Sequence, residues 1–105
     1  MVDEEAVQKF EGKANGLRSA ILSSNFIKEL PSNLSPFKNI KHVLLNENIL
    51  SSLPSSVSSF QSLTVLDLRA NRLSYIPSDI CSLKNLESLL LSSNSIEVGK
   101  RFFLF

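Results

Sequence analysis

Two residues in this sequence carry the imidazole and thiol groups that most often act as catalytic base, nucleophile or zinc ligand. They are His42 and Cys81, each the only residue of its kind. A nucleophilic cysteine needs a base within hydrogen-bonding reach, and a structural zinc ion needs four ligands. The three glycines are scattered and form no phosphate-binding loop. We therefore expect no enzyme, no metal and no cofactor, with His42 a solvated surface residue and Cys81 a partly buried thiol.

The asparagines follow a more regular pattern than these groups. Four of them stand 23 residues apart without insertion or deletion, and apolar residues keep fixed positions around each one. These four are Asn25, Asn48, Asn71 and Asn94. A buried side-chain amide has two donors and an acceptor, so each can satisfy backbone groups of its own turn and of a neighbouring turn. A fixed period of this length predicts a solenoid of stacked repeats.

The apolar residues before each asparagine alternate along the chain. In the first repeat, Ala20 and Leu22 point one way, while Ser19, Ile21 and Ser23 point the other. Such alternation predicts a short strand with one buried face. Four of these strands, stacked repeat upon repeat, predict a parallel sheet.

The repeats resemble the leucine-rich repeat family, whose motif reads L-x-x-L-x-L-x-x-N-x-L. The matching segments are LRSAILSSNFI, IKHVLLNENIL, LTVLDLRANRL and LESLLLSSNSI. The pairs Leu30-Pro31, Leu53-Pro54 and Ile76-Pro77 resemble the intracellular, Ras-group type with 23-residue repeats. The resemblance implies an α/β leucine-rich repeat solenoid of about four repeats, with a short parallel sheet on the concave side. The repeats are expected at 17–39, 40–62, 63–85 and, in part, 86–98.

The segments outside the repeats have patterns of their own. Residues 1–16 are interpreted as an N-terminal capping helix, because Asp3 is a good N-cap and an apolar face containing Phe10 could cover the first strand. A partner-binding arm is the alternative. Residues 99–105 form an atypical tail, which is either a plug for the last repeat or a sign that a longer repeat protein is truncated. An apolar tail at an open sheet end also offers a point of self-association.

Composition and charge exclude several classes of partner. The net charge is +1, with acids and bases mixed, so nothing indicates nucleic acid or an anionic membrane. No run of 18 apolar residues occurs, which argues against membrane insertion. Secreted members of the family usually carry cysteine-rich caps, which a single cysteine cannot make. We therefore expect the cytoplasm or the nucleus, and interpret the glycosylation sequon Asn33-Leu34-Ser35 as a chance match.

The resemblance also implies where a partner binds. Side chains between the buried leucines emerge on the concave sheet, the surface with which this family usually binds proteins. An apolar centre with a charged edge is typical of a protein-binding site, although β-favouring residues tolerated in a sheet are the alternative. The candidate binding residues are Ile21, His42, Leu44, Asn46, Val65, Asp67, Arg69, Arg72 and Leu90.

Two classes of function stay open from the sequence. The first is a non-enzymatic protein-interaction module for intracellular signalling or scaffolding, with a partner whose identity the sequence does not reveal. The second is a structural or oligomerising role, or a fragment of a longer leucine-rich repeat protein without binding activity of its own.

Overall fold

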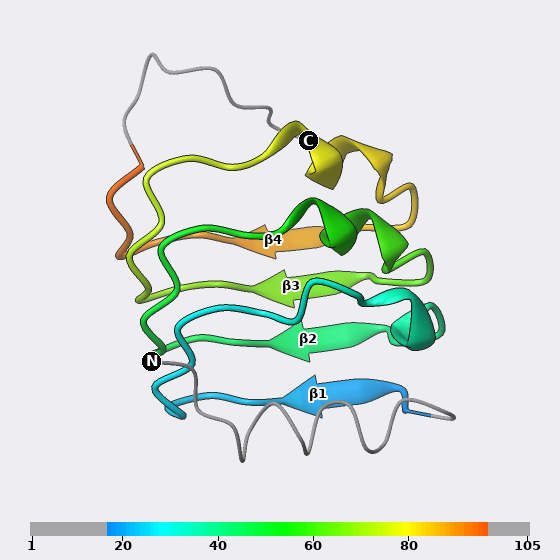
Figure 1. The fold of residues 1–105 in the computed structure, drawn as a ribbon, viewed down its shortest axis with the longest axis horizontal. Coiled ribbons are helices and arrows are strands. Elements are labelled where there is room, and N and C mark those ends of the chain that lie inside the picture. The colour runs from blue at the N-terminus through cyan, green and yellow to red at the C-terminus, as the bar shows by residue number, and fades with distance from the viewer. Residues whose placement is uncertain (1–16, 97–105) are drawn as a thin grey trace.

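A computed structural model describes residues 17–96 of the chain. The expected capping helix within 1–16 and the tail at 99–105 lie outside the described residues. The described part contains four strands of three residues each: β1 (Ser19–Ile21), β2 (His42–Leu44), β3 (Val65–Asp67) and β4 (Ser88–Leu90). They pair in parallel and in chain order to form one sheet (Figure 1). The predicted parallel sheet is confirmed.

The register of the sheet reproduces the period of the sequence. The central residue Ala20 pairs with Val43, Val43 with Leu66, and Leu66 with Leu89. Each partner is therefore the equivalent residue of the next repeat. Since adjacent strands lie about 4.8 Å apart, equivalent side chains stack in columns that run across the sheet.

Alternation along each strand separates the core from the surface. Val43 and Leu66 are buried, as are Leu45 and Leu68 two residues further on. The return segments supply the opposite wall of the core, where Phe37 and Phe60 are fully buried. The core residues of the outer repeats Leu17, Leu86, Leu89, Leu91 and Ile96 are only partly buried, because each lies near one end of the described stack.

The return segments contain 3₁₀ helices, which the sequence pattern did not predict. These are η1 (Ser35–Phe37), η2 (Ser55–Ser59) and η3 (Ser78–Ser82). With three residues per turn, a 3₁₀ helix turns Ile80 and Leu83 inward and leaves the residue after Ile80 outside. Cys81 is accordingly exposed, so the prediction of a partly buried thiol was wrong.

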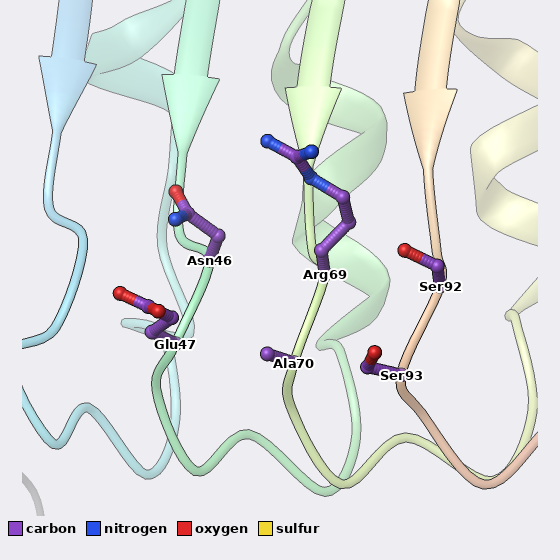
Figure 2. A pocket seen from close by; sticks show the side chains of 6 residues that line it. All are labelled: Asn46, Glu47, Arg69, Ala70, Ser92 and Ser93. Atoms are coloured by element: carbon purple, nitrogen blue, oxygen red, sulfur yellow. The ribbon is translucent and has the colours of Figure 1, made fainter.

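The chain turns sharply just after each strand. The third residue after each strand has a positive φ in every repeat, although none of the four is a glycine. These residues are Ser24 (57°), Glu47 (60°), Ala70 (57°) and Ser93 (60°), the last three of which are shown in Figure 2. A left-handed conformation costs an ordinary residue about 1–2 kcal/mol. The turn persists because its N–H groups are bonded to the next repeat, as where Ala70 N donates to Ser92 O at 3.0 Å.

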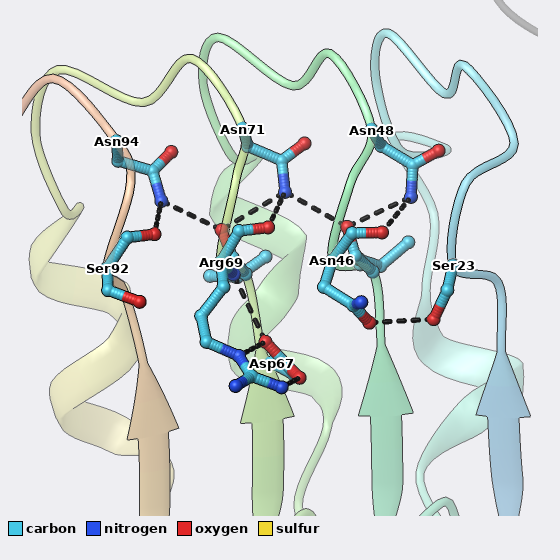
Figure 3. Close-up of polar contacts among 10 residues, drawn as sticks. Ser23, Asn46, Asn48, Asp67, Arg69, Asn71, Ser92 and Asn94 are labelled. Atoms are coloured by element: carbon cyan, nitrogen blue, oxygen red, sulfur yellow. Dashed lines mark hydrogen bonds and ion pairs between the residues drawn. The ribbon is translucent and has the colours of Figure 1, made fainter.

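Three of the four asparagines, Asn48, Asn71 and Asn94, join adjacent repeats through their side-chain amides (Figure 3). Asn71 Nδ2 donates to Leu68 O at 3.1 Å and to Leu45 O of the preceding repeat at 2.9 Å, and its Oδ1 accepts from Leu50 N at 2.9 Å. Asn48 is bonded in the same way one repeat earlier. These two asparagines are buried, whereas Asn25 and Asn94 at the ends of the stack are half-buried.

Candidate functional site

The candidate site is the surface of the sheet that faces away from the core, which we call the strand face. Its side chains alternate with the buried residues along β1 to β4 and continue two residues past each strand. The strand face comprises Ser19, Ile21, Ser23, His42, Leu44, Asn46, Val65, Asp67, Arg69, Ser88, Leu90 and Ser92.

Three large apolar side chains share one column of the strand face. Ile21 is 71% exposed and Leu90 is 37% exposed, and Leu44 is half-buried beside Ile21. Val65 is half-buried on the neighbouring column. Exposed apolar side chains that lie in contact range across adjacent strands are the usual centre of a protein-binding surface.

The fourth member of this column is an acid. Asp67 pairs in register with Leu44 on one side and Leu90 on the other, yet it is only 3% exposed. Arg69 covers it: Nε donates to Asp67 Oδ1 at 2.9 Å and Nη2 donates to Oδ2 at 2.7 Å (Figure 3). The backbone N–H of Arg69 donates to Oδ1 as well, at 3.1 Å.

The ion pair lowers the pKa of Asp67 and raises the pKa of Arg69. The side-chain hydrogen bonds from Arg69 lower the pKa of Asp67, and they outweigh the burial of the carboxylate, which acts in the opposite direction. The same bonds raise the pKa of Arg69. Both groups therefore stay charged near neutral pH, and a fixed, neutral pair stands in the middle of the apolar column.

Polar side chains join the strands at the two ends of the strand face. His42 Nδ1 lies 3.1 Å from Ser19 Oγ, and Ser23 Oγ donates to Asn46 Oδ1 at 2.7 Å. Arg72 lies further on, in the turn after β3. Its side chain is exposed, and its backbone N–H donates to Leu50 O.

A shallow hollow of about 350 Å³ lies where the strand face meets the turns (Figure 2). The short side chain of Ala70 forms part of its lining, between Glu47 and Ser93 of the adjacent repeats. The hollow is lined by Asn46, Glu47, Arg69, Ala70, Ser92 and Ser93. Reasoning from the sequence missed Glu47, Ala70 and Ser93 as lining residues of this hollow.

The described residues offer no metal centre. Between residues 17 and 96, no group of three or more His, Cys, Asp or Glu side chains is placed to hold a metal ion. Over the same residues, no helix has the length and apolar character needed to cross a membrane. Every buried side-chain polar atom in this part of the chain has a hydrogen-bond partner. The polar groups left for a ligand are therefore those at the surface.

Comparison with known proteins agrees with the repeat pattern. The profile of the family described as "Leucine rich repeat" matches residues 38–96, more than half of the chain. Among solved structures, a leucine-rich repeat protein of Leptospira interrogans is similar, with a TM-score of 0.76 and 36% sequence identity. The similarity covers 78% of this chain but 21% of that one, so the chain spans about a fifth of the length of its relative. No curated protein matches the chain significantly.

These similarities carry a general expectation about function. Leucine-rich repeat domains generally mediate protein–protein interaction and are generally non-enzymatic. The period of 23 residues, the asparagine bonds between repeats and the similarity over residues 38–96 agree, and the chain belongs to the leucine-rich repeat family.

Proposed function

We propose that this chain is a non-enzymatic protein-interaction module whose strand face binds a folded partner, in intracellular signalling or scaffolding. The observation that supports it most is the exposure of Ile21 and Leu90 in one column of the sheet, with Leu44 between them and Asp67 beside it. A strand position that faces water does not require a large apolar residue. Burial of these apolar side chains against a partner would be favourable by about 25 cal/mol per Å² of apolar surface.

The arrangement also supports specificity. A fixed ion pair between two apolar side chains rejects a partner that places only apolar groups over it, because Arg69 would lose water without gaining an acceptor. The compartment we propose is the cytoplasm or nucleus, where the exposed free thiol of Cys81 would stay reduced.

Site-specific photocrosslinking in native cells tests this proposal without knowledge of the partner. A photoreactive amino acid placed at His42, which is exposed on the strand face, should form a discrete adduct with a partner protein. The matched control places the same group at Ser78, which is exposed on the return segment in η3. Adducts formed equally from both positions, or from Ser78 alone, would contradict the choice of face.

A second candidate role is association between copies of the chain. The observation that favours it is the partial exposure of Leu89 and Leu91, whose equivalents Leu66 and Leu68 are buried in the preceding repeat. Sedimentation velocity at two concentrations separates the two roles. A monomer at both concentrations supports the interaction module, whereas a shift to a dimer that grows with concentration supports self-association.

A further inference from the structure

One edge of the Arg69 guanidinium is left free by its bonds to Asp67. Nε and one N–H of Nη2 are bonded to the carboxylate. A guanidinium has five N–H donors, so two on Nη1 and one on Nη2 remain, and no acceptor among residues 17–96 takes them. The Arg69 side chain is half-exposed, while the Asp67 beneath it is buried and fixes its plane. The free edge is therefore an oriented pair of donors that matches the two oxygens of a carboxylate.

The surroundings of this edge decide which anion suits it. Glu47 lines the same hollow, and its carboxylate accepts from Ser24 Oγ at 2.7 Å and points away from Arg69 (Figure 2). On the other side of Arg69, the hollow is lined by the neutral hydroxyl of Ser92 (Figure 2). A single arginine with an acid nearby suits a singly charged carboxylate better than a dianionic phosphate, because the repulsion from Glu47 grows with the charge of the ligand.

The spacing of the column indicates the shape of the partner. The guanidinium covers Asp67, whose register partners are Leu44 and Leu90, so apolar groups lie about 5 Å away on either side. Side chains three or four residues apart on an α-helix are separated by about 5–6 Å, which is close to this spacing. Alternate residues of an extended chain are about 6.6–6.8 Å apart. This distance exceeds the spacing of the strands, so successive side chains of such a peptide would not lie over successive strands.

We propose that the strand face binds an amphipathic α-helix of a partner protein, laid across the strands, and that an Asp or Glu of this helix binds the free edge of Arg69. Apolar residues one helical turn before and after that acid pack on Leu44 and Leu90. The inference rests on the proposed function and specifies the chemistry of the partner.

The test is a selection from displayed helical peptides of about 18 residues, long enough to hold helical structure, with three positions randomised at four-residue intervals on one face. The full 105-residue chain serves as bait. We expect enrichment of Asp or Glu at the central position and of apolar residues at the outer two. Circular dichroism of an enriched peptide should show helix in the complex. An extended bound peptide, or a central position without an acid, would overturn the inference.

A double-mutant cycle on the enriched peptide tests the contact itself. Arg69→Gln, or replacement of the peptide's acid by its amide, should each weaken binding about 10- to 100-fold, the range expected for hydrogen bonds to charged groups. The two changes together should cost little more than either alone. Lys84→Gln removes the same charge from an exposed site near the end of η3 and should leave binding unchanged.

The outcomes separate this inference from the function on which it rests. Two results would overturn the carboxylate site alone, provided that Ile21→Ser with Leu44→Ser still abolishes binding. The first is that Arg69→Gln and the change of the peptide's acid weaken binding independently. The second is that a peptide with phosphoserine at the central position binds more tightly. A selection that yields no peptide sensitive to that double substitution would count against both.

Discussion

The Asp67 carboxylate lies beneath the Arg69 guanidinium, which donates to both of its oxygens at 2.9 and 2.7 Å, and only the arginine is open to solvent. The two residues are two positions apart, so the alternation of a strand brings their side chains to the same face. Asp67 occupies the column position that Ile21, Leu44 and Leu90 fill in the other repeats. One repeat thus places a fixed charge pair in an otherwise apolar column.

Asp67 should make the stability of the fold depend on pH in the acid range. Its pKa in the folded protein lies below the ordinary value of 3.8, chiefly because of the hydrogen bond from the Arg69 side chain. A group with a lowered folded pKa contributes its full stabilisation above the unfolded value and loses it as the pH falls through the folded value. Urea-unfolding midpoints should therefore fall more steeply below pH 3.8 in the wild type than in Asp67→Asn. Equal slopes in the two proteins would contradict the assignment.

Asn71→Ala should destabilise the protein by about 1–3 kcal/mol, because it leaves buried backbone groups of two repeats without partners. Urea denaturation followed by circular dichroism measures the loss. Asn25→Ala is the matched control, since Asn25 is half-buried and its amide donates to Ser23 O within its own repeat. Equal losses from the two substitutions would mean that the bonds between repeats contribute little.

Truncation of two phenylalanines to alanine should change the unfolding free energy by very different amounts. Phe60 lies in a return segment and is fully buried, so Phe60→Ala should cost about 3–5 kcal/mol through lost burial and a cavity. Phe26 is 75% exposed, and Phe26→Ala should change the unfolding free energy by no more than about 0.5 kcal/mol. Thermal unfolding of both variants provides the comparison. A large loss at Phe26 would contradict the exposure of this side chain.

Sequence periodicity predicted the parts of the fold in which each residue has the same role in every repeat. The alternation in Ala20, Ile21 and Leu22 predicted the strands, and the 23-residue period predicted their parallel stacking. The 3₁₀ helices were not predicted, because runs such as Ser55–Ser59 are serine-rich and carry one buried residue, Val57, which is too few to define a period. The exposure of Cys81 depends on that local geometry.

The candidate site was predictable in its columns but not in its details. Ile21, Leu44 and Leu90 were placed together from the alternation alone, and the structure puts them in one column. The sequence placed Asp67 and Arg69 on the charged edge of the apolar patch, and did not predict that one would bury the other. That arrangement depends on the side-chain conformations of two residues. The hollow beside Ala70 depends on left-handed turns at non-glycine residues, which have no sequence signature here.

The central claim is that a partner binds the strand face, and its most direct test is capture of that partner by a variant with an altered face. Ile21→Ser together with Leu44→Ser removes two adjoining apolar side chains without adding charge, and serine already occupies strand-face positions such as Ser19 and Ser88. Tyr75→Ser is the control, because Tyr75 is 45% exposed away from the strands and Ser52 holds the equivalent position in the preceding repeat.

The measurement is the affinity of the partner identified by photocrosslinking for these two variants, after their melting curves have shown that both are folded. We predict that the double variant loses binding by at least about tenfold, as expected when apolar residues at the centre of an interface are truncated, while Tyr75→Ser binds like the wild type. Unchanged affinity in the double variant, with binding lost in Tyr75→Ser, would contradict the account and place the partner on the other surface of the solenoid.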